Sequence, residues 1–113
     1  MIIEIRTYRL VPGTRDDFVE VMRNESVPLL REYGIDVVDC GASLVDEDGH
    51  EEAYLIRAFA SREEHRRQED RFYASAQWRD GPREAIVSRI ESYHAIVIVI
   101  EASDDAVAAL RSQ

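Results

Sequence analysis

The opening of this chain, residues 2–14, constrains the fold more than any other stretch. Two sets of side chains alternate there, an aliphatic set of Ile3, Ile5 and Thr7 and a polar set of Glu4, Arg6 and Tyr8. Successive side chains of a strand point to opposite faces, so this pattern predicts a strand with one aliphatic face and one polar face. Pro12 and Gly13 end the strand, and Thr14, three residues before Asp17, predicts a capping box at the start of a helix. A polar set on a strand that looks central indicates a functional site.

The rest of the chain predicts an alternation of helices and strands. We expect helices over 15–33, 62–78 and 82–90, and strands over 35–45, 53–60 and 92–100. Gly34 is expected to end the first helix, and Ser61, three residues before Glu64, to cap the second as a capping box. The order β-α-β-β-α-β predicts an α+β fold of the ferredoxin-like type, with an antiparallel sheet and both helices on one face. We assign residues 1–101 to this domain and 102–113 to a short C-terminal helical tail that Ser103 caps.

Two local features refine this prediction. Pro28 lies inside the first helical pattern, and because it cannot donate a hydrogen bond we expect a kink or break nearby. In the strand over 35–45, strict alternation places Val38 and Cys40 on one face and Val37 and Asp39 on the other.

The last strand has an apolar residue at every position from 95 to 100. A strand that is apolar on both sides is expected to be buried on both sides. A ferredoxin-like sheet leaves one face uncovered, and two identical open sheets can bury each other. The run therefore predicts a homodimer.

Composition limits the possible partners. The formal net charge of −9 argues against nucleic acid and anionic membranes. The longest apolar run is far shorter than the roughly 20 residues that span a bilayer, and charged side chains interrupt the N-terminus, so we expect no membrane partner and no signal peptide. A single cysteine, Cys40, excludes an intramolecular disulfide. We expect a soluble protein of the cytoplasm.

Several segments together resemble the NIPSNAP family. The opening segment 3–13 is similar to the family's N-terminal signature, and residues 61–66, Phe72 to Tyr73, Trp78 and 81–84 are similar to its second half. The resemblance implies a dimeric α/β barrel, in which two ferredoxin-like protomers pack their sheets together around enclosed clefts. NIPSNAP members mostly lack an assigned reaction. Wider relatives of this architecture include cofactor-free monooxygenases of aromatic polyketides and muconolactone-type isomerases.

These observations support three hypotheses about function. The chain could be a cofactor-independent monooxygenase or isomerase acting on a small apolar or aromatic molecule in the barrel cleft. It could also be a ligand-binding dimer without chemistry, or a protein-interaction module. Because one fold hosts many activities, the resemblance itself does not choose between them.

The polar set on the first strand supplies the main candidate residues. Arg6 could hold an anionic oxygen of a substrate, Tyr8 could donate a hydrogen bond to a developing enolate, and Glu4 could take a proton if burial raised its pKa. The alternative is a structural ion pair of Glu4 with Arg6 or Arg57, because buried charges are normally paired.

Other candidates come from histidines and aromatic residues. His94 lies in phase with the apolar residues of the last strand and could act as a general base, or it could be a hydrogen-bonded histidine at a strand start. Phe72 and Trp78 could form the wall of an apolar pocket or pack in the core. His65 and Glu69 share one helix face, but the nearby sequence offers no third ligand, so we expect a surface contact and no metal or cofactor.

Overall fold

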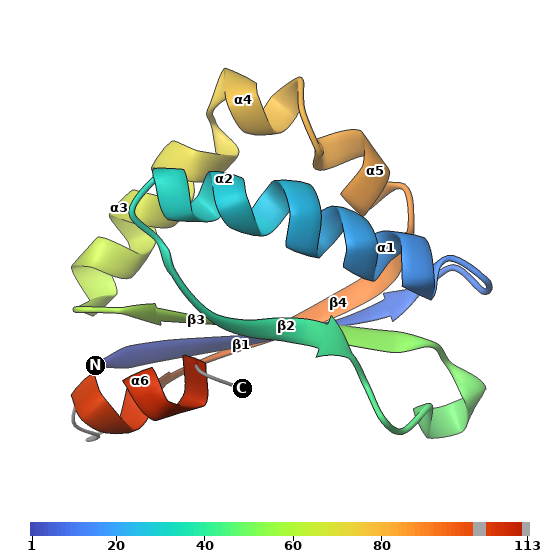
Figure 1. The fold of residues 1–113 in the computed structure, drawn as a ribbon, viewed down its shortest axis with the longest axis horizontal. Coiled ribbons are helices and arrows are strands. Elements are labelled where there is room, and N and C mark those ends of the chain that lie inside the picture. Colours follow the sequence, from blue (N-terminus) through green and yellow to red (C-terminus); the bar gives the residue numbers. More distant parts are fainter. Residues whose placement is uncertain (101–103, 112–113) are drawn as a thin grey trace.

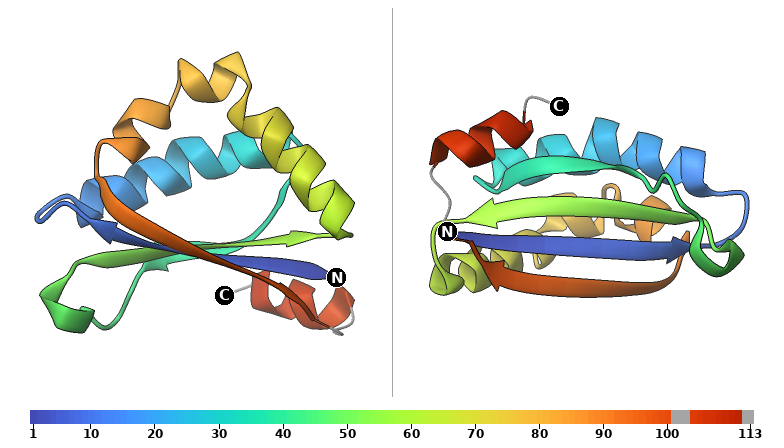
Figure 2. Two further views of the ribbon diagram at one scale, coloured as in Figure 1. Left: turned by 180° about the vertical axis from the view of Figure 1, so that it is seen from behind. Right: turned by 90° about the horizontal axis from the view of Figure 1, so that it is seen from below.

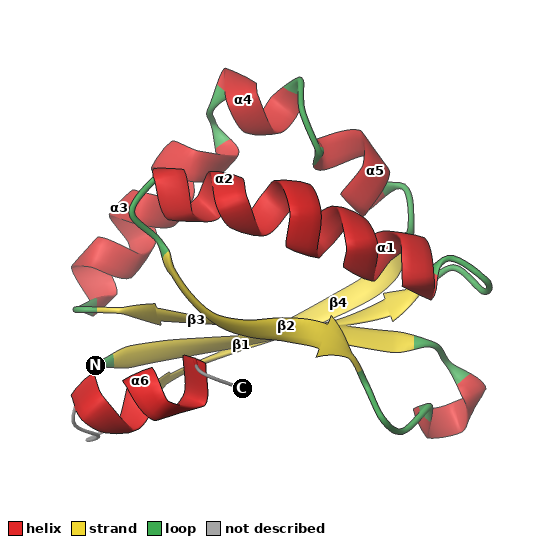
Figure 3. Ribbon diagram, in the orientation of Figure 1, coloured by secondary structure: helices red, strands yellow, loops and turns green. Residues whose placement is uncertain are grey.

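The computed structural model describes residues 1–100 and 104–111. Its sheet contains four strands: β1 (Ile2–Leu10), β2 (Asp36–Ala42), β3 (Glu52–Phe59) and β4 (Ile90–Val99). The strands are arranged in the order β2-β3-β1-β4, and every neighbouring pair is antiparallel. Figure 3 shows the sheet beneath a layer of helices. The α+β ferredoxin-like prediction is confirmed, and β1 is a central strand.

Two groups of helices cover one face of this sheet (Figure 1). Between β1 and β2 lie α1 (Arg15–Val21), a π-helical turn (Met22–Ser26) and α2 (Val27–Glu32). Between β3 and β4 lie α3 (Arg62–Tyr73), α4 (Ala76–Arg79) and α5 (Arg83–Val87). A short 3₁₀ turn (Glu47–Gly49) joins β2 to β3, and α6 (Asp104–Arg111) follows β4. Figure 2 shows α6 on the opposite side of the sheet from the other helices.

The first helical region confirms the expected irregularity and corrects its start. Pro28 is the second residue of α2, the helix that directly follows the π-helical turn. It removes the N–H that the carbonyl of Asn24 would accept in a regular helix, which gives the widened turn a physical cause. Thr14 does not form the expected capping box, because its hydroxyl donates to the Val11 carbonyl at 2.6 Å instead.

The second helical region is more broken than predicted. Ser61 caps α3 as expected, accepting from the Glu64 N–H at 3.1 Å. A second cap, Ser75, accepts from the Trp78 N–H at 3.2 Å and starts α4 as a separate element. The chain thus makes three short helices where the sequence predicts two. The tail cap expected at Ser103 and the domain boundary at 101/102 lie outside the described residues.

A β-bulge changes the face assignment in β2. The pairing with β3 shifts between Val37 and Asp39, so Val38 is an extra residue in the ladder. Val37 and Cys40 consequently join the core beneath the helices, while Val38 joins a cluster on the opposite face. The prediction that Val38 and Cys40 share a face was wrong, because it assumed uninterrupted alternation.

The two faces of the sheet differ in how well they are covered. The core lies between sheet and helices and includes Leu10, Phe18, Leu30, Leu55 and Phe72. The other face, here called the open face, carries the buried Ile3, Val38 and Ala58. The expectation that β4 is buried on both sides does not hold within one chain: it is an edge strand, and Ile96 and Val99 are 49% and 69% exposed.

Candidate functional site

The polar side chains of β1 point toward the helices. Glu4 pairs across the sheet with Arg57 of β3, which is fully buried. Its Oε1 accepts from Arg57 Nε at 2.9 Å and from Arg57 Nη2, and its Oε2 lies 3.3 Å from Arg6 Nη2. The ion pair weighed from the sequence is present, and it involves both arginines.

One face of α3 meets these groups. His65, Glu69 and Tyr73 are four residues apart and share one side of the helix. Glu69 Oε1 accepts from Arg57 Nη2 at 3.1 Å and from Arg6 Nη2 at 3.3 Å. The hydroxyl of Tyr73 accepts from Arg57 Nη1 at 2.8 Å and from Arg6 Nη1 at 3.2 Å. We call this group the polar cluster: Glu4, Arg6, Arg57, His65, Glu69 and Tyr73.

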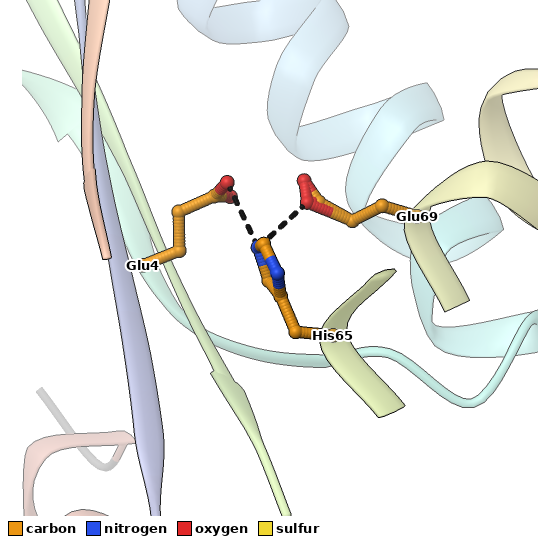
Figure 4. A group of neighbouring side chains, drawn as sticks. All are labelled: Glu4, His65 and Glu69. Carbon is orange, nitrogen blue, oxygen red and sulfur yellow. Dashed lines mark hydrogen bonds and ion pairs between the residues drawn. The ribbon is translucent and has the colours of Figure 1, made fainter. Parts of the chain in front are cut away.

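Figure 4 shows Glu4 and Glu69 converging on His65. His65 Nε2 lies 3.3 Å from Glu4 Oε2 and 3.1 Å from Glu69 Oε2. The expected contact between His65 and Glu69 is present, but both side chains are largely covered instead of lying on the surface. Glu4, from a distant part of the sequence, also contacts His65.

These three residues could in principle hold a metal, since their ligand atoms lie within 4.8 Å of one another. Arg6 and Arg57 already bind both carboxylates, however, and would oppose a divalent cation. The arrangement suits a shared proton better, because two adjacent carboxylates resist being ionised together.

The two carboxyl groups respond differently to burial. Burial raises the pKa of Glu4, but the charges of Arg57 and Arg6 outweigh this effect and lower the pKa to about 2. Burial raises the pKa of Glu69; Arg57 opposes the rise and the neighbouring Glu4 adds to it. The condition set from the sequence, that burial raises the pKa of Glu4, is therefore not met, whereas the pKa of Glu69 is raised.

A cavity of about 260 Å³ lies between the sheet and the helices, next to the polar cluster. Its apolar lining consists of Met22, Leu30, Leu55, Phe72, Trp78, Ile86, Val87 and Ile90. Its polar lining consists of Arg6, Tyr8, Ser26, Tyr73, Arg83 and Tyr93. The size and the mostly apolar wall suit a small organic molecule.

Two polar groups of this lining lack partners among the described residues. Arg6 Nε and Ser26 Oγ are both buried without a hydrogen bond. Buried polar atoms are nearly always paired, so an unpaired one needs an explanation. Tyr8 also lines the cavity, and burial first, then the proximity of Tyr73, raises its pKa, which keeps its phenol neutral.

The structure brings together most of the residues predicted from sequence. Arg6, Tyr8, Phe72 and Trp78 line the cavity, whereas Glu4 and Arg57 lie behind Arg6 in the polar cluster. His94 lies apart from all of them. It pairs with Thr7 on the open face, while its neighbour Tyr93 pairs with Tyr8 and reaches the cavity.

Sequence reasoning missed Ser26 and the inward face of α3. Ser26 lies four residues after Met22, on the apolar stripe of the first helix, and two residues before Pro28. A polar residue on an apolar stripe, close to a proline, was the signal in the sequence that could have identified it. Glu69 was assigned to a solvated helix surface, because its stripe is polar. The stripe is largely covered nevertheless, since it faces an equally polar strand.

Comparison with known proteins agrees with this architecture. The family model described as NIPSNAP matches residues 3–100. No curated protein matches the chain. Among the described residues, no helix is long and apolar enough to cross a membrane.

Solved structures show the same fold at low sequence identity. An uncharacterized NIPSNAP domain protein from Burkholderia xenovorans is 22% identical with a TM-score of 0.76, covering 90% of this chain and 96% of that one. A NIPSNAP family protein from Agrobacterium tumefaciens is 16% identical with a TM-score of 0.75, covering 91% and 96%. A monooxygenase from Streptomyces coelicolor, in complex with nanaomycin D, is 15% identical with a TM-score of 0.62, covering 90% and 88%. With the family model matching nearly its whole length, this chain belongs to the NIPSNAP family.

Proposed function

We propose that this protein binds a small apolar or aromatic molecule in the cavity and acts on it as a cofactor-independent monooxygenase or isomerase. The observation that carries the proposal is the pair of unpaired buried groups, Arg6 Nε and Ser26 Oγ, on a mostly apolar wall. A bound molecule with oxygen functions would satisfy both. The monooxygenase of the same fold that binds nanaomycin D supports a ligand of this class.

The proposed roles follow from the geometry. Both reactions pass through an enolate-type anion, which needs a cation or hydrogen-bond donors at its oxygen. Arg6 supplies the positive charge, and the neutral phenol of Tyr8 supplies a donor. Phe72 and Trp78 hold the apolar body of the molecule.

We also propose that the working unit is a homodimer that buries the open face. Ile5 and Ile56 are only partly buried there, and Ile96 and Ile98 of β4 are 49% and 36% exposed. Burying aliphatic surface contributes about 25 cal/mol per Å². The single buried Cys40 also fits a reducing compartment such as the cytoplasm.

Native mass spectrometry tests the ligand and the assembly together. A dimer that carries additional mass supports the proposal and identifies a chemical class for the ligand. Oxygen uptake and product mass with hydroxylated naphthalenes then test chemistry, comparing the wild type with Arg6→Met and Tyr8→Phe. Binding without turnover in any of the three would favour the non-catalytic alternative. No ligand and no binding would favour a protein-interaction module.

A further inference from the structure

The polar cluster places two carboxyl groups, those of Glu4 and Glu69, beside each other and beside two arginines. Glu4 is fixed as an anion, because Arg57 donates to its Oε1 from two nitrogens and Arg6 donates to its Oε2. Glu69 is held less completely. Its Oε1 accepts from both arginines, but its Oε2 is buried with no hydrogen bond among the described residues.

A proton on Glu69 Oε2 removes this defect. The unpaired acceptor Oε2 becomes a hydrogen-bond donor. His65 Nε2 lies 3.1 Å from it, and the ligand atoms of Glu4, His65 and Glu69 all lie within 4.8 Å of one another (Figure 4). The groups that face Glu69 come from three elements: Glu4 and Arg6 of β1, Arg57 of β3, and His65 of α3 itself. Tyr73 of α3 reaches the same two arginines through its hydroxyl. Of these, the two arginines favour the ionised form and Glu4 opposes it.

Protonation of Glu69 changes the charge next to the cavity. Two guanidinium groups then face one carboxylate, which leaves one uncompensated positive charge. Of the two arginines in the polar cluster, Arg6 lines the cavity, and its Nε has no partner among the described residues. A negatively charged oxygen in the cavity would both pair with Arg6 Nε and balance the cluster.

We propose that the cavity selects molecules carrying one ionised oxygen on an apolar body, such as a phenolate, an enolate or a carboxylate, and that their binding is coupled to protonation of Glu69. This inference rests on the proposed ligand-binding function. His65 provides the route for the proton, because its side chain is 14% exposed and its Nε2 contacts both carboxyl groups. At pH values where Glu69 is ionised in the free protein, one proton then enters from solvent for each anion bound.

The direction of the pH dependence follows from this coupling. The anion binds best when Glu69 is protonated, so affinity is highest at low pH and falls as the pH rises through the raised pKa of Glu69. Above that pKa, linkage of one proton lowers the affinity by about tenfold for each pH unit. A neutral ligand lacks this dependence.

The experiment uses two probes of similar shape. 2-Naphthalenesulfonate remains ionised throughout the accessible pH range. 2-Naphthol remains neutral as long as the pH is below the pKa of its phenol group. Binding of each is measured by calorimetry from acidic to mildly alkaline pH, in buffers with different ionisation enthalpies. We expect the wild type to take up a proton with the sulfonate, to lose sulfonate affinity as the pH rises, and to bind the naphthol without pH dependence.

Two variants assign the effect to Glu69. Glu69→Gln is permanently neutral, so we expect it to bind the sulfonate with no proton uptake and a flat pH profile. Glu64→Gln removes a carboxylate on the same helix that pairs with Arg67, and we expect the wild-type slope to remain. The proton uptake of the wild type is measured without any variant, so it tests the coupling even if Glu69→Gln folds poorly.

The outcomes separate this inference from the proposed function. A flat sulfonate profile in the wild type, or an unchanged slope in Glu69→Gln, overturns the coupling. Naphthol binding without sulfonate binding overturns the preference for anions but leaves the cavity as a ligand site. Failure of both probes to bind overturns the coupling together with the proposal that the cavity takes aromatic molecules.

Discussion

The helix-facing side of β1 meets two different environments along its length. At Glu4, the carboxylate receives donors from Arg57 and Arg6, and Arg57 has no exposure to solvent. At the other end, the cavity beside Tyr8 leaves Arg6 Nε and Ser26 Oγ without partners among the described residues. The carboxylate of Glu4 is thus satisfied within the chain, whereas two polar groups beside the cavity are not.

This difference separates stability from function along a single strand. Removing a partner from the satisfied end leaves a buried charge alone, which is costly. Removing a group from the incomplete end deletes an atom that was already unpaired, which costs little in the free protein. Arg6 belongs to both ends, so its substitution should affect both properties.

The largest effect is expected for Arg57→Met. This change leaves two buried carboxyl groups with only Arg6 as a cation, and losing one partner of a buried ion pair costs about 3–5 kcal/mol. Urea unfolding followed by circular dichroism measures the loss. Arg67→Met is the matched control: its pair with Glu64 is largely exposed, and such pairs contribute at most about 1 kcal/mol. Equal losses in the two variants would contradict the comparison.

Acid should weaken the satisfied end next. The pKa of Glu4 is lowered from 4.5 to about 2, so its stabilisation is present above the unfolded-state pKa and is lost as pH falls through the folded-state pKa. A shift of this size corresponds to about 3 kcal/mol. Chemical unfolding at stepwise lower pH measures this loss, and Glu4→Gln should lack it. If Glu4→Gln and the wild type lose stability in parallel, Glu4 is not the group responsible.

The open face provides the third test. Ile96→Asp introduces a charge into the proposed dimer interface, so we expect monomers at concentrations where the wild type is dimeric, with helix and strand content retained. Val99→Asp is a matched control on the same strand, because Val99 pairs with Ile2 on the helix-facing side. Light scattering after size exclusion gives the mass of each variant. A wild-type monomer would remove the basis for this comparison.

The smallest change in stability is expected for Ser26→Ala. Its hydroxyl is buried and unpaired, so removing it should leave the free energy of unfolding unchanged or slightly higher. Ser75→Ala removes a hydroxyl that caps α4 and should cost about 1 kcal/mol. Binding of 2-naphthol should fall in Ser26→Ala, which calorimetry checks. Destabilisation of Ser26→Ala as large as that of Ser75→Ala would show that its hydroxyl has a partner after all.

The sequence predicted the order of elements because each depends on local pattern and chemistry. Alternation in β1, the Ser61 cap and the terminating Gly34, which has a positive φ of 78°, are properties of adjacent residues. The β-bulge at Val38 was not predictable, since no turn residue marks it and only the pairing partner reveals the extra residue.

Only part of the candidate site could be predicted from the sequence, again because the rest depends on contacts between distant segments. Arg6 and Tyr8 could be identified because polar residues alternate with aliphatic ones on a central strand. Glu69 and Tyr73 could not, because burial is normally inferred from apolar periodicity and their stripe is polar. A buried polar stripe becomes recognisable only once a complementary polar strand is placed opposite, and that requires the tertiary fold.

The exposed edge of β4 has a consequence for how the chain survives in the cell. Residues 95–100 form a six-residue segment of β-branched and small apolar side chains without charge, proline or glycine, the composition typical of segments that form amyloid-like stacks. Edge strands usually carry a charge or a bulge that prevents such pairing, and this segment has no charged side chain. It is also made late in synthesis, after the other three strands. Newly made chains should therefore be most prone to aggregate when few folded protomers are available and many unfolded chains are nearby. Rapid pairing of protomers would then protect this segment from aggregation.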